Sequence, residues 1–163
     1  MRVKIKVALS SICLLIFLLP AGTGGAKTVN GYVKKVIDGD SLIIKTDDGR
    51  IREVRLYGID SPEYDQPFAE LSKNYLKKKV LNKRVKVKII DRDRYKRDVC
   101  LVQRDDTLIN GELIRLGYSW VYSKYCKKNF CNKWKKYQKL AKKRKKGLWK
   151  GKKPISPWLW KHK

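Results

Sequence analysis

A guanidinium and two carboxylates lie within nine residues of each other in the first half of the chain. Arg55 belongs to an alternating strand pattern, Gly58 breaks that pattern, and Asp60 and Glu63 follow in a turn. Carboxylates suit a hard cation and an activated water, while a fixed guanidinium suits phosphate oxygens. The alternative is a surface turn with ordinary charges, so the interpretation depends on the rest of the chain.

Two further polar segments fit the same chemistry. Asp38-Gly39-Asp40 is a tight turn, and such turns are usually structural. If adjacent strands bring Asp40 and Asp60 together, their oxygens can ligate one Ca²⁺. The segment 93–97, Asp-Arg-Tyr-Lys-Arg, adds guanidiniums and a stackable ring, or is only an exposed hairpin tip.

The histidine content excludes several kinds of hydrolase. His162 is the only histidine, and it lies one residue from the end of the chain. Hydrolases with a histidine base, and nucleases with paired histidines, are therefore not expected. Any catalysis must use carboxylates, Arg, Lys, Tyr or a metal.

The hydrophobic pattern predicts strands before and between helices. The chain contains no internal repeats and no long linker, and its first three strands form a meander typical of an antiparallel sheet or barrel. The expected strands are 29–37, 41–45, 51–57, 85–89 and 99–103, and the expected helices run from Pro67, over about 109–116 up to Gly117, and from Phe130 to Gly147.

Residues 1–26 have the three-part layout of a secretory signal peptide. A basic head precedes a mostly apolar run from Val7 to Leu19, and small residues then lead to a cleavage site after Ala26. The apolar run is shorter than the ~20 residues that span a bilayer, so a permanent anchor is the weaker interpretation. We expect an exported protein, secreted or periplasmic.

The charge of the remaining chain is extreme. The leader holds three of the 41 basic residues and none of the 15 acidic ones, which leaves 38 against 15, or +23. Such a field attracts nucleic acid first, and an anionic membrane or cell-wall polymer second. No acidic residue follows Glu112, although 18 Lys and Arg do.

The cysteines fit an oxidising compartment. Cys126 and Cys131 flank a short loop and are expected to form a disulfide. A zinc site would need a second pair of ligands and is the poorer alternative. Cys100 lies in an expected core strand, where it acts as a small apolar residue.

Several separated motifs together resemble those of the staphylococcal-nuclease-like (thermonuclease) family. The resemblance covers about residues 29–150 and is specific because the motifs occur in order. They are Ile37-Asp38-Gly39-Asp40-Ser41, Arg55 with Gly58-Ile59-Asp60-Ser61-Pro62-Glu63, Asp93-Arg94-Tyr95-Lys96-Arg97, and Gly147-Leu148-Trp149.

The resemblance implies an α+β fold, a five-stranded OB-fold (oligonucleotide/oligosaccharide-binding) barrel with three helices. This domain would span residues 27–153, between the leader and a basic Pro/Trp tail at 154–163. The implied activity is Ca²⁺-dependent hydrolysis of DNA and RNA to 3′-phosphates. No protein partner is implied, and we expect a monomer.

The resemblance also assigns roles to individual residues. Asp40, Asp60 and the Ser61 backbone carbonyl would ligate one Ca²⁺. Glu63 would act as general base or orient the attacking water, and the phosphate would be held by Arg55 and Arg97. Substrate contacts are expected from Arg94, Tyr95 and Tyr125.

The chain departs from the family pattern around Arg97. Lys96 stands where the family usually has glycine, and Asp98 stands where a small or neutral residue is usual. Asp98 is a possible partner for Arg97.

Two rival functions remain open: a noncatalytic nucleic-acid-binding module, and a cationic surface protein that binds anionic polymer. For the tail, docking on the barrel is favoured over binding to membrane or wall, because exposed tryptophan pairs usually have a partner.

Overall fold

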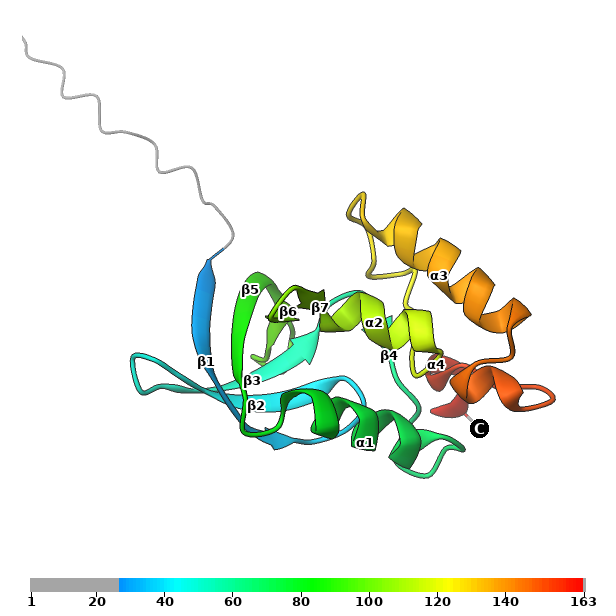
Figure 1. The fold of residues 1–163 in the computed structure, drawn as a ribbon, viewed down its shortest axis with the longest axis horizontal. Helices are drawn as coiled ribbons and strands as arrows, with labels where there is room; N and C mark the ends of the chain where they lie inside the picture. Colours follow the sequence, from blue (N-terminus) through cyan, green and yellow to red (C-terminus); the bar gives the residue numbers. More distant parts are fainter. Residues whose placement is uncertain (1–26, 163) are drawn as a thin grey trace, which may run out of the picture.

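The computed structural model describes residues 27–162 (Figure 1). The expected signal peptide, 1–26, lies outside the described residues. The elements in chain order are β1 Thr28–Val36, β2 Ser41–Thr46, β3 Ile51–Leu56, β4 Ile59–Asp60, α1 Ala69–Val80, β5 Arg84–Arg92, β6 Asp98–Arg104, β7 Thr107–Leu108, α2 Ile109–Leu116, β8 Trp120–Val121, α3 Cys131–Lys143, the 3-10 helix η1 Gly147–Lys150 and α4 Pro157–Trp160.

Five strands close into a barrel. The sheet runs in the order β3-β2-β1-β5-β6-β7, and a further pairing of β3 with β6 closes the ring. That closing pair is parallel, while the other barrel pairs are antiparallel. The five paired strands thus form a closed ring, as expected for an OB-fold barrel. The α+β prediction and the five-stranded barrel are confirmed.

The core follows from the alternation of side chains along these strands. Apolar side chains on one face of each strand point into the barrel, where they are almost fully buried, and polar residues alternate with them. The buried strand residues include Val33, Leu42, Ile44, Val54, Leu56, Val85, Val87, Cys100 and Val102. Because the apolar face of each strand fills the core, only side chains on its other face or at its ends can form a functional site.

The helices lie outside the barrel. In Figure 1, α1 lies along one side of the barrel, and α2 lies between the barrel and α3. Gly117 has φ 77° and ends α2 as a left-handed cap, as predicted. Within residues 27–162, three helices have eight or more residues, and α4 is a short fourth one in the tail.

Two helix ends differ from the sequence prediction. The first helix begins at Ala69 rather than at Pro67, because Phe68 takes a left-handed conformation with φ 72°. The third ends at Lys143 rather than at Gly147. Lys145 has φ 47°, and the Lys146 N–H donates to the Ala141 carbonyl at 3.0 Å, which closes the helix one turn early.

The tail folds back onto the domain. Pro157 is buried, and the Trp158 ring stacks on the Tyr122 ring with centroids 5.0 Å apart. Leu148 and Trp149 of η1 also turn inward and are buried. None of the helices in the described part of the chain is long and apolar enough to cross a membrane.

Candidate active site

Strand register brings three of the predicted residues together at one end of the barrel. Ser41 pairs with Arg55 across β2 and β3, so Asp40, just before Ser41, lies beside the Arg55 side chain. The Leu56 N–H donates to the Asp40 carbonyl at 2.8 Å, which fixes the turn against β3. The β3 strand then turns at Gly58, whose φ of 71° favours glycine, and β4 delivers Asp60.

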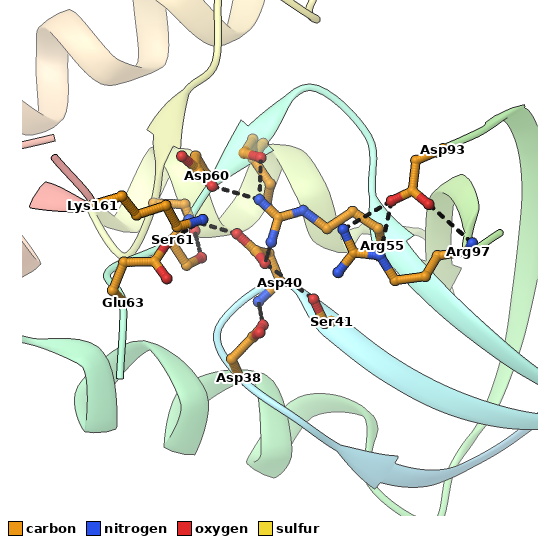
Figure 2. A network of polar contacts seen from close by, with 12 residues as sticks. Asp38, Asp40, Ser41, Arg55, Asp60, Ser61, Glu63, Asp93, Arg97 and Lys161 are labelled. Atoms are coloured by element: carbon orange, nitrogen blue, oxygen red, sulfur yellow. Dashed lines mark hydrogen bonds and ion pairs between the residues drawn. The ribbon is translucent and has the colours of Figure 1, made fainter. Parts of the chain in front are cut away.

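The Arg55 guanidinium lies between the two carboxylates (Figure 2). One terminal nitrogen donates to Asp40 Oδ1, and the other donates to Asp60 Oδ1 at 2.5 Å. The Ser61 N–H donates to Asp40 Oδ2 at 2.5 Å. Asp40 and Asp60 are only 1% and 2% exposed and the Arg55 side chain is 19% exposed, so the three charges form one largely buried network.

Burial dominates the electrostatics of this network. It raises the pKa of Asp40 well above the ordinary value for a carboxyl group, and it also raises the pKa of Asp60, although Arg55 opposes both shifts. Asp38 adds to the rise at Asp40, and its Oδ1 accepts the Asp40 N–H at 2.9 Å. Several carboxylates therefore share one guanidinium, and a further cation would relieve their repulsion.

The donor set fits a hard divalent cation. The candidate ligands, Asp40, Asp60 and the Ser61 carbonyl, supply only oxygen, as Ca²⁺ prefers, and the two carboxylates are held close by their shared contact with Arg55. Within residues 27–162, no three His, Cys, Asp or Glu side chains are grouped as metal ligands. A Ca²⁺ ion would thus rely on two carboxylates, a carbonyl and water.

Glu63 lies at the edge of the network, in contact with the tail. Its Oε1 is 2.9 Å from Lys161 Nζ, and its backbone N–H donates to Gln66 Oε1 at 3.0 Å. Burial lowers the pKa of Lys161, but the hydrogen bond and charge of Glu63 outweigh burial, so that pKa is raised overall. Lys161 was not among the residues predicted from the sequence, because 98 positions separate it from Glu63.

Arg97 does not join the Arg55 network. Its Nε donates to Asp93 Oδ2 at 2.8 Å, and the Asp93 carboxylate also accepts the Arg97 backbone N–H at 3.0 Å (Figure 2). Lys96 adopts φ 64° in this turn, the conformation for which the family pattern has glycine. The guanidinium is thus held by its own loop.

The possible pairing of Asp98 with Arg97 is wrong. Asp98 Oδ2 instead accepts a hydrogen bond from Arg52 Nη1 at 2.7 Å. The parallel pairing of β3 with β6 places Asp98 opposite Val54, next to Arg52 in the alternating pattern. Asp98 therefore forms an ion pair between β6 and β3, where the barrel closes, and the carboxylate that binds Arg97 is that of Asp93.

The predicted substrate contacts are exposed but lie in two different segments. Tyr95 is 65% exposed, its hydroxyl accepts a hydrogen bond from Arg94 at 2.7 Å, and the Arg94 guanidinium lies over the ring. Tyr125 is 55% exposed and meets the Tyr122 ring edge-on. No contact joins Tyr95 or Tyr125 to the buried carboxylates within the described residues.

The disulfide predicted from the sequence forms between Cys126 and Cys131. It packs against the turn that leads to Asp60, since a Cβ placed on Gly58 would lie 2.6 Å from Cys126 Sγ. The Tyr57 hydroxyl accepts the Lys127 N–H at 3.1 Å beside it. Cys100 is a buried free thiol, and burial raises its pKa to about 12.

Comparison with known proteins agrees with this arrangement. Residues 53–151 match the family model described as "Staphylococcal nuclease homologue". An uncharacterized endonuclease of Escherichia coli O157:H7 is 34% identical over 135 residues, which cover 82% of this chain and 86% of that protein. An uncharacterized endonuclease of Haemophilus influenzae is 32% identical over 155 residues, covering 95% and 84%.

A plant relative is similar over a shorter part of its length. A probable staphylococcal-like nuclease of Oryza sativa subsp. japonica is 36% identical over 107 residues, which cover 66% of this chain and 31% of that protein. The match of the family model and the bacterial relatives together settle the family. This chain belongs to the staphylococcal nuclease homologue family of nucleases.

Proposed function

We propose that this nuclease hydrolyses the phosphodiester bonds of both DNA and RNA with one Ca²⁺ ion and leaves 3′-phosphate products. The observation that carries the proposal is the buried network of Asp40, Arg55 and Asp60. Burying two carboxylates and one guanidinium away from water is costly, so a purely structural role is an inefficient use of them. A divalent cation would be bound by the two carboxylates, and the phosphodiester by the guanidinium, so this ligand pair uses both kinds of charge.

The chemistry that a metal supplies here is charge compensation and the activation of water. Ca²⁺ held by Asp40, Asp60 and the Ser61 carbonyl would offset the negative charge of the phosphate and polarise a bound water. Hydrogen bonds from Arg55 and from the Ser61 N–H hold the two carboxylates before substrate arrives, so little reorganisation is needed during the reaction.

The chain's own side chains divide the remaining work. Arg55, which contacts both carboxylates, would donate to a phosphate oxygen on the metal side. Arg97 comes from the loop at 93–97 and would donate from another direction, or to the departing oxygen. Because the transition state of the displacement carries more negative charge than the ground state, both guanidiniums stabilise it preferentially.

Glu63 is the candidate for the attacking side. Its carboxylate is 28% exposed, which gives water access to it, in contrast to Asp40 and Asp60. A positioned carboxylate can accept a proton from water or orient it for in-line attack. Lys161 Nζ lies 2.9 Å from one of its oxygens, and this ion pair favours one orientation of the carboxylate.

The direct experiment is digestion of single-stranded DNA, duplex DNA and RNA with Ca²⁺, with Mg²⁺ and with a chelator. The proposal expects cleavage of all three substrates with Ca²⁺, none with chelator, and 3′-phosphate ends. Cleavage that is unaffected by a chelator would contradict the metal role. Tight binding without cleavage under any metal would favour the noncatalytic module instead.

We further propose that the protein acts outside the cytoplasm, secreted or periplasmic. The leader-like segment 1–26 and the disulfide between Cys126 and Cys131 support this. Mass spectrometry of the protein recovered from its producing cells should find a chain beginning at Lys27. A chain that keeps its first 26 residues would contradict cleavage of the leader.

A further inference from the structure

The C-terminal tail, residues 154–162, reaches the loop that follows β4. Gln66 Nε2 donates to the Ile155 carbonyl at 2.6 Å, and Trp160 Nε1 donates to Asp65 Oδ1 at 2.9 Å. Both partners lie just after Glu63 in the sequence, so the tail runs beside the candidate active site. Figure 1 shows α4 on the side of the molecule where β4 lies.

Aromatic packing fixes the middle of the tail. The Trp158 and Tyr122 rings are nearly parallel, with an angle of 5° between their planes. Tyr122 is itself fixed to the active-site turn, because its N–H donates to the Gly58 carbonyl at 3.0 Å. The neighbouring residues Ser156 and Pro157 are buried. These contacts offset the entropy lost when the tail is ordered.

The docked tail brings Lys161 to the active site. An exposed ion pair contributes little stability by itself, so the contact between Lys161 and Glu63 is a consequence of docking rather than its cause. Trp158 and Lys161 are three residues apart across a helical turn and therefore lie on neighbouring positions of its surface. The packing of Trp158 on Tyr122 therefore also holds Lys161 near Glu63.

Lys161 has hydrogen-bonding capacity that Glu63 does not use. Its side chain is 54% exposed, and an ammonium group has three N–H donors, of which Glu63 engages one. The charge of Lys161 also lowers the pKa of Asp60, although burial raises that pKa overall. A free N–H of a cation at this point is well suited to a phosphate oxygen.

We propose that the C-terminal tail is a substrate-binding arm, and that Lys161 contacts a backbone phosphate of the bound nucleic acid beside Glu63. The ligand class is a phosphodiester chain, and this inference rests on the proposed nuclease function for the identity of that ligand. In addition to Arg55 and Arg97, Lys161 would be a third cation of the site, and it is the one of the three that comes from the tail.

The test measures binding without cleavage. A fluorescein-labelled single-stranded oligonucleotide is titrated with the whole protein in chelator, at several salt concentrations, and its fluorescence anisotropy is followed. Lys161→Gln should weaken binding roughly three- to ten-fold. Because one phosphate contact is lost, the slope of log affinity against log salt should decrease in magnitude by about 0.7.

A matched control separates a local contact from overall charge. Lys153 lies in the segment that leads into the tail and is exposed, so Lys153→Gln removes the same charge away from Glu63. Its affinity and salt slope should stay within about two-fold and about 0.2 of the parent values, since long-range attraction is largely screened. Lys161→Arg, which keeps the charge, should recover most of the affinity.

The anchor provides a second variant. Trp158→Ala should release the tail and weaken binding as much as Lys161→Gln, and the double variant should be no weaker than Trp158→Ala alone. Thermal unfolding of each variant shows whether the domain is still folded. Independent, additive effects of the two substitutions would contradict the arm.

The remaining outcomes are also decisive. If Lys161→Gln binds like the parent and like Lys153→Gln, Lys161 does not touch the substrate and the proposal is wrong. If Lys161→Gln binds more tightly, or cleaves faster in Ca²⁺, the tail blocks the site and the proposal is again wrong. If the parent never cleaves but the loss of binding is observed, the arm stands and the nuclease chemistry fails.

Discussion

The two halves of the candidate site are built in different ways. Asp40, Arg55 and Asp60 come from or adjoin paired strands, and each is mostly buried. Arg97 and Glu63 come from loops, and each is held by one oppositely charged neighbour, Asp93 or Lys161. A buried network at the end of the barrel thus fixes the metal side, whereas single ion pairs, one within a loop and one with the tail, hold the phosphate and water side. Stability and activity should therefore separate between the halves.

The largest effect is expected from Arg55→Gln in the buried half. Removal of the guanidinium leaves Asp40 and Asp60 buried without their partner, which should lower the free energy of unfolding by about 3–5 kcal/mol. Urea unfolding measures this change. Added Ca²⁺ should restore part of the loss, because a cation again offsets the two carboxylates. Unchanged stability would show that the network is not coupled to folding.

Arg97→Gln makes the same charge change in the half of the site that loops provide. Its effect on the free energy of unfolding should stay within about 1 kcal/mol, because Arg97 and Asp93 form a partly exposed pair. The turnover number should nevertheless decrease about 10²- to 10³-fold, since one donor to the transition state is lost. Steady-state cleavage of RNA or DNA, together with urea unfolding, checks both parts. A large loss of stability would remove the contrast between the halves.

The disulfide supports the buried half. Replacement of Cys126 and Cys131 by serine should lower the free energy of unfolding by about 2 kcal/mol, a value typical of such a short loop. Because the bridge packs on Gly58, cleavage should also decline in the variant near its lower unfolding temperature. Cys100→Ser is a control for the loss of a thiol outside the bridge. Equal stability of parent and double variant would contradict this support.

The smallest effect is expected at Lys96. Lys96→Gly should stabilise the protein by about 0.5–1 kcal/mol, because glycine adopts a positive φ without steric cost. Asp93 already holds Arg97 in the parent, so the turnover number should change less than two- to three-fold, on the order of 0.5 kcal/mol in the barrier. A large gain in activity would mean that Lys96 misplaces Arg97 in the parent.

Local signals in the sequence predicted much of the fold. Alternating apolar residues gave the five barrel strands, and Gly117 marked the end of α2. The same signals misplaced the end of α3, because Lys145 rather than Gly147 adopts the first left-handed conformation after the helix. A preference of glycine for positive φ is a tendency, and a lysine can take that conformation when packing holds it there.

Contacts between distant segments were harder to predict. The motifs pointed to Asp40, Arg55 and Asp60, but they did not show that Arg55 bridges both carboxylates. The pairing of Asp98 with Arg52 depends on how β6 closes against β3, which no local pattern reveals. Lys161 was missed for the same reason. The tryptophans of the tail were the only signal, and they predicted docking without saying where.

The most direct test of the account is Glu63→Gln, studied for cleavage and for binding. Gln keeps the size of Glu63 but cannot accept a proton as a carboxylate does. We predict that cleavage in Ca²⁺ decreases about 10³-fold or more, while oligonucleotide affinity in chelator stays within about three-fold of the parent. If Glu63→Gln cleaves as well as the parent, Glu63 is not the group that activates water, and the proposed mechanism is wrong.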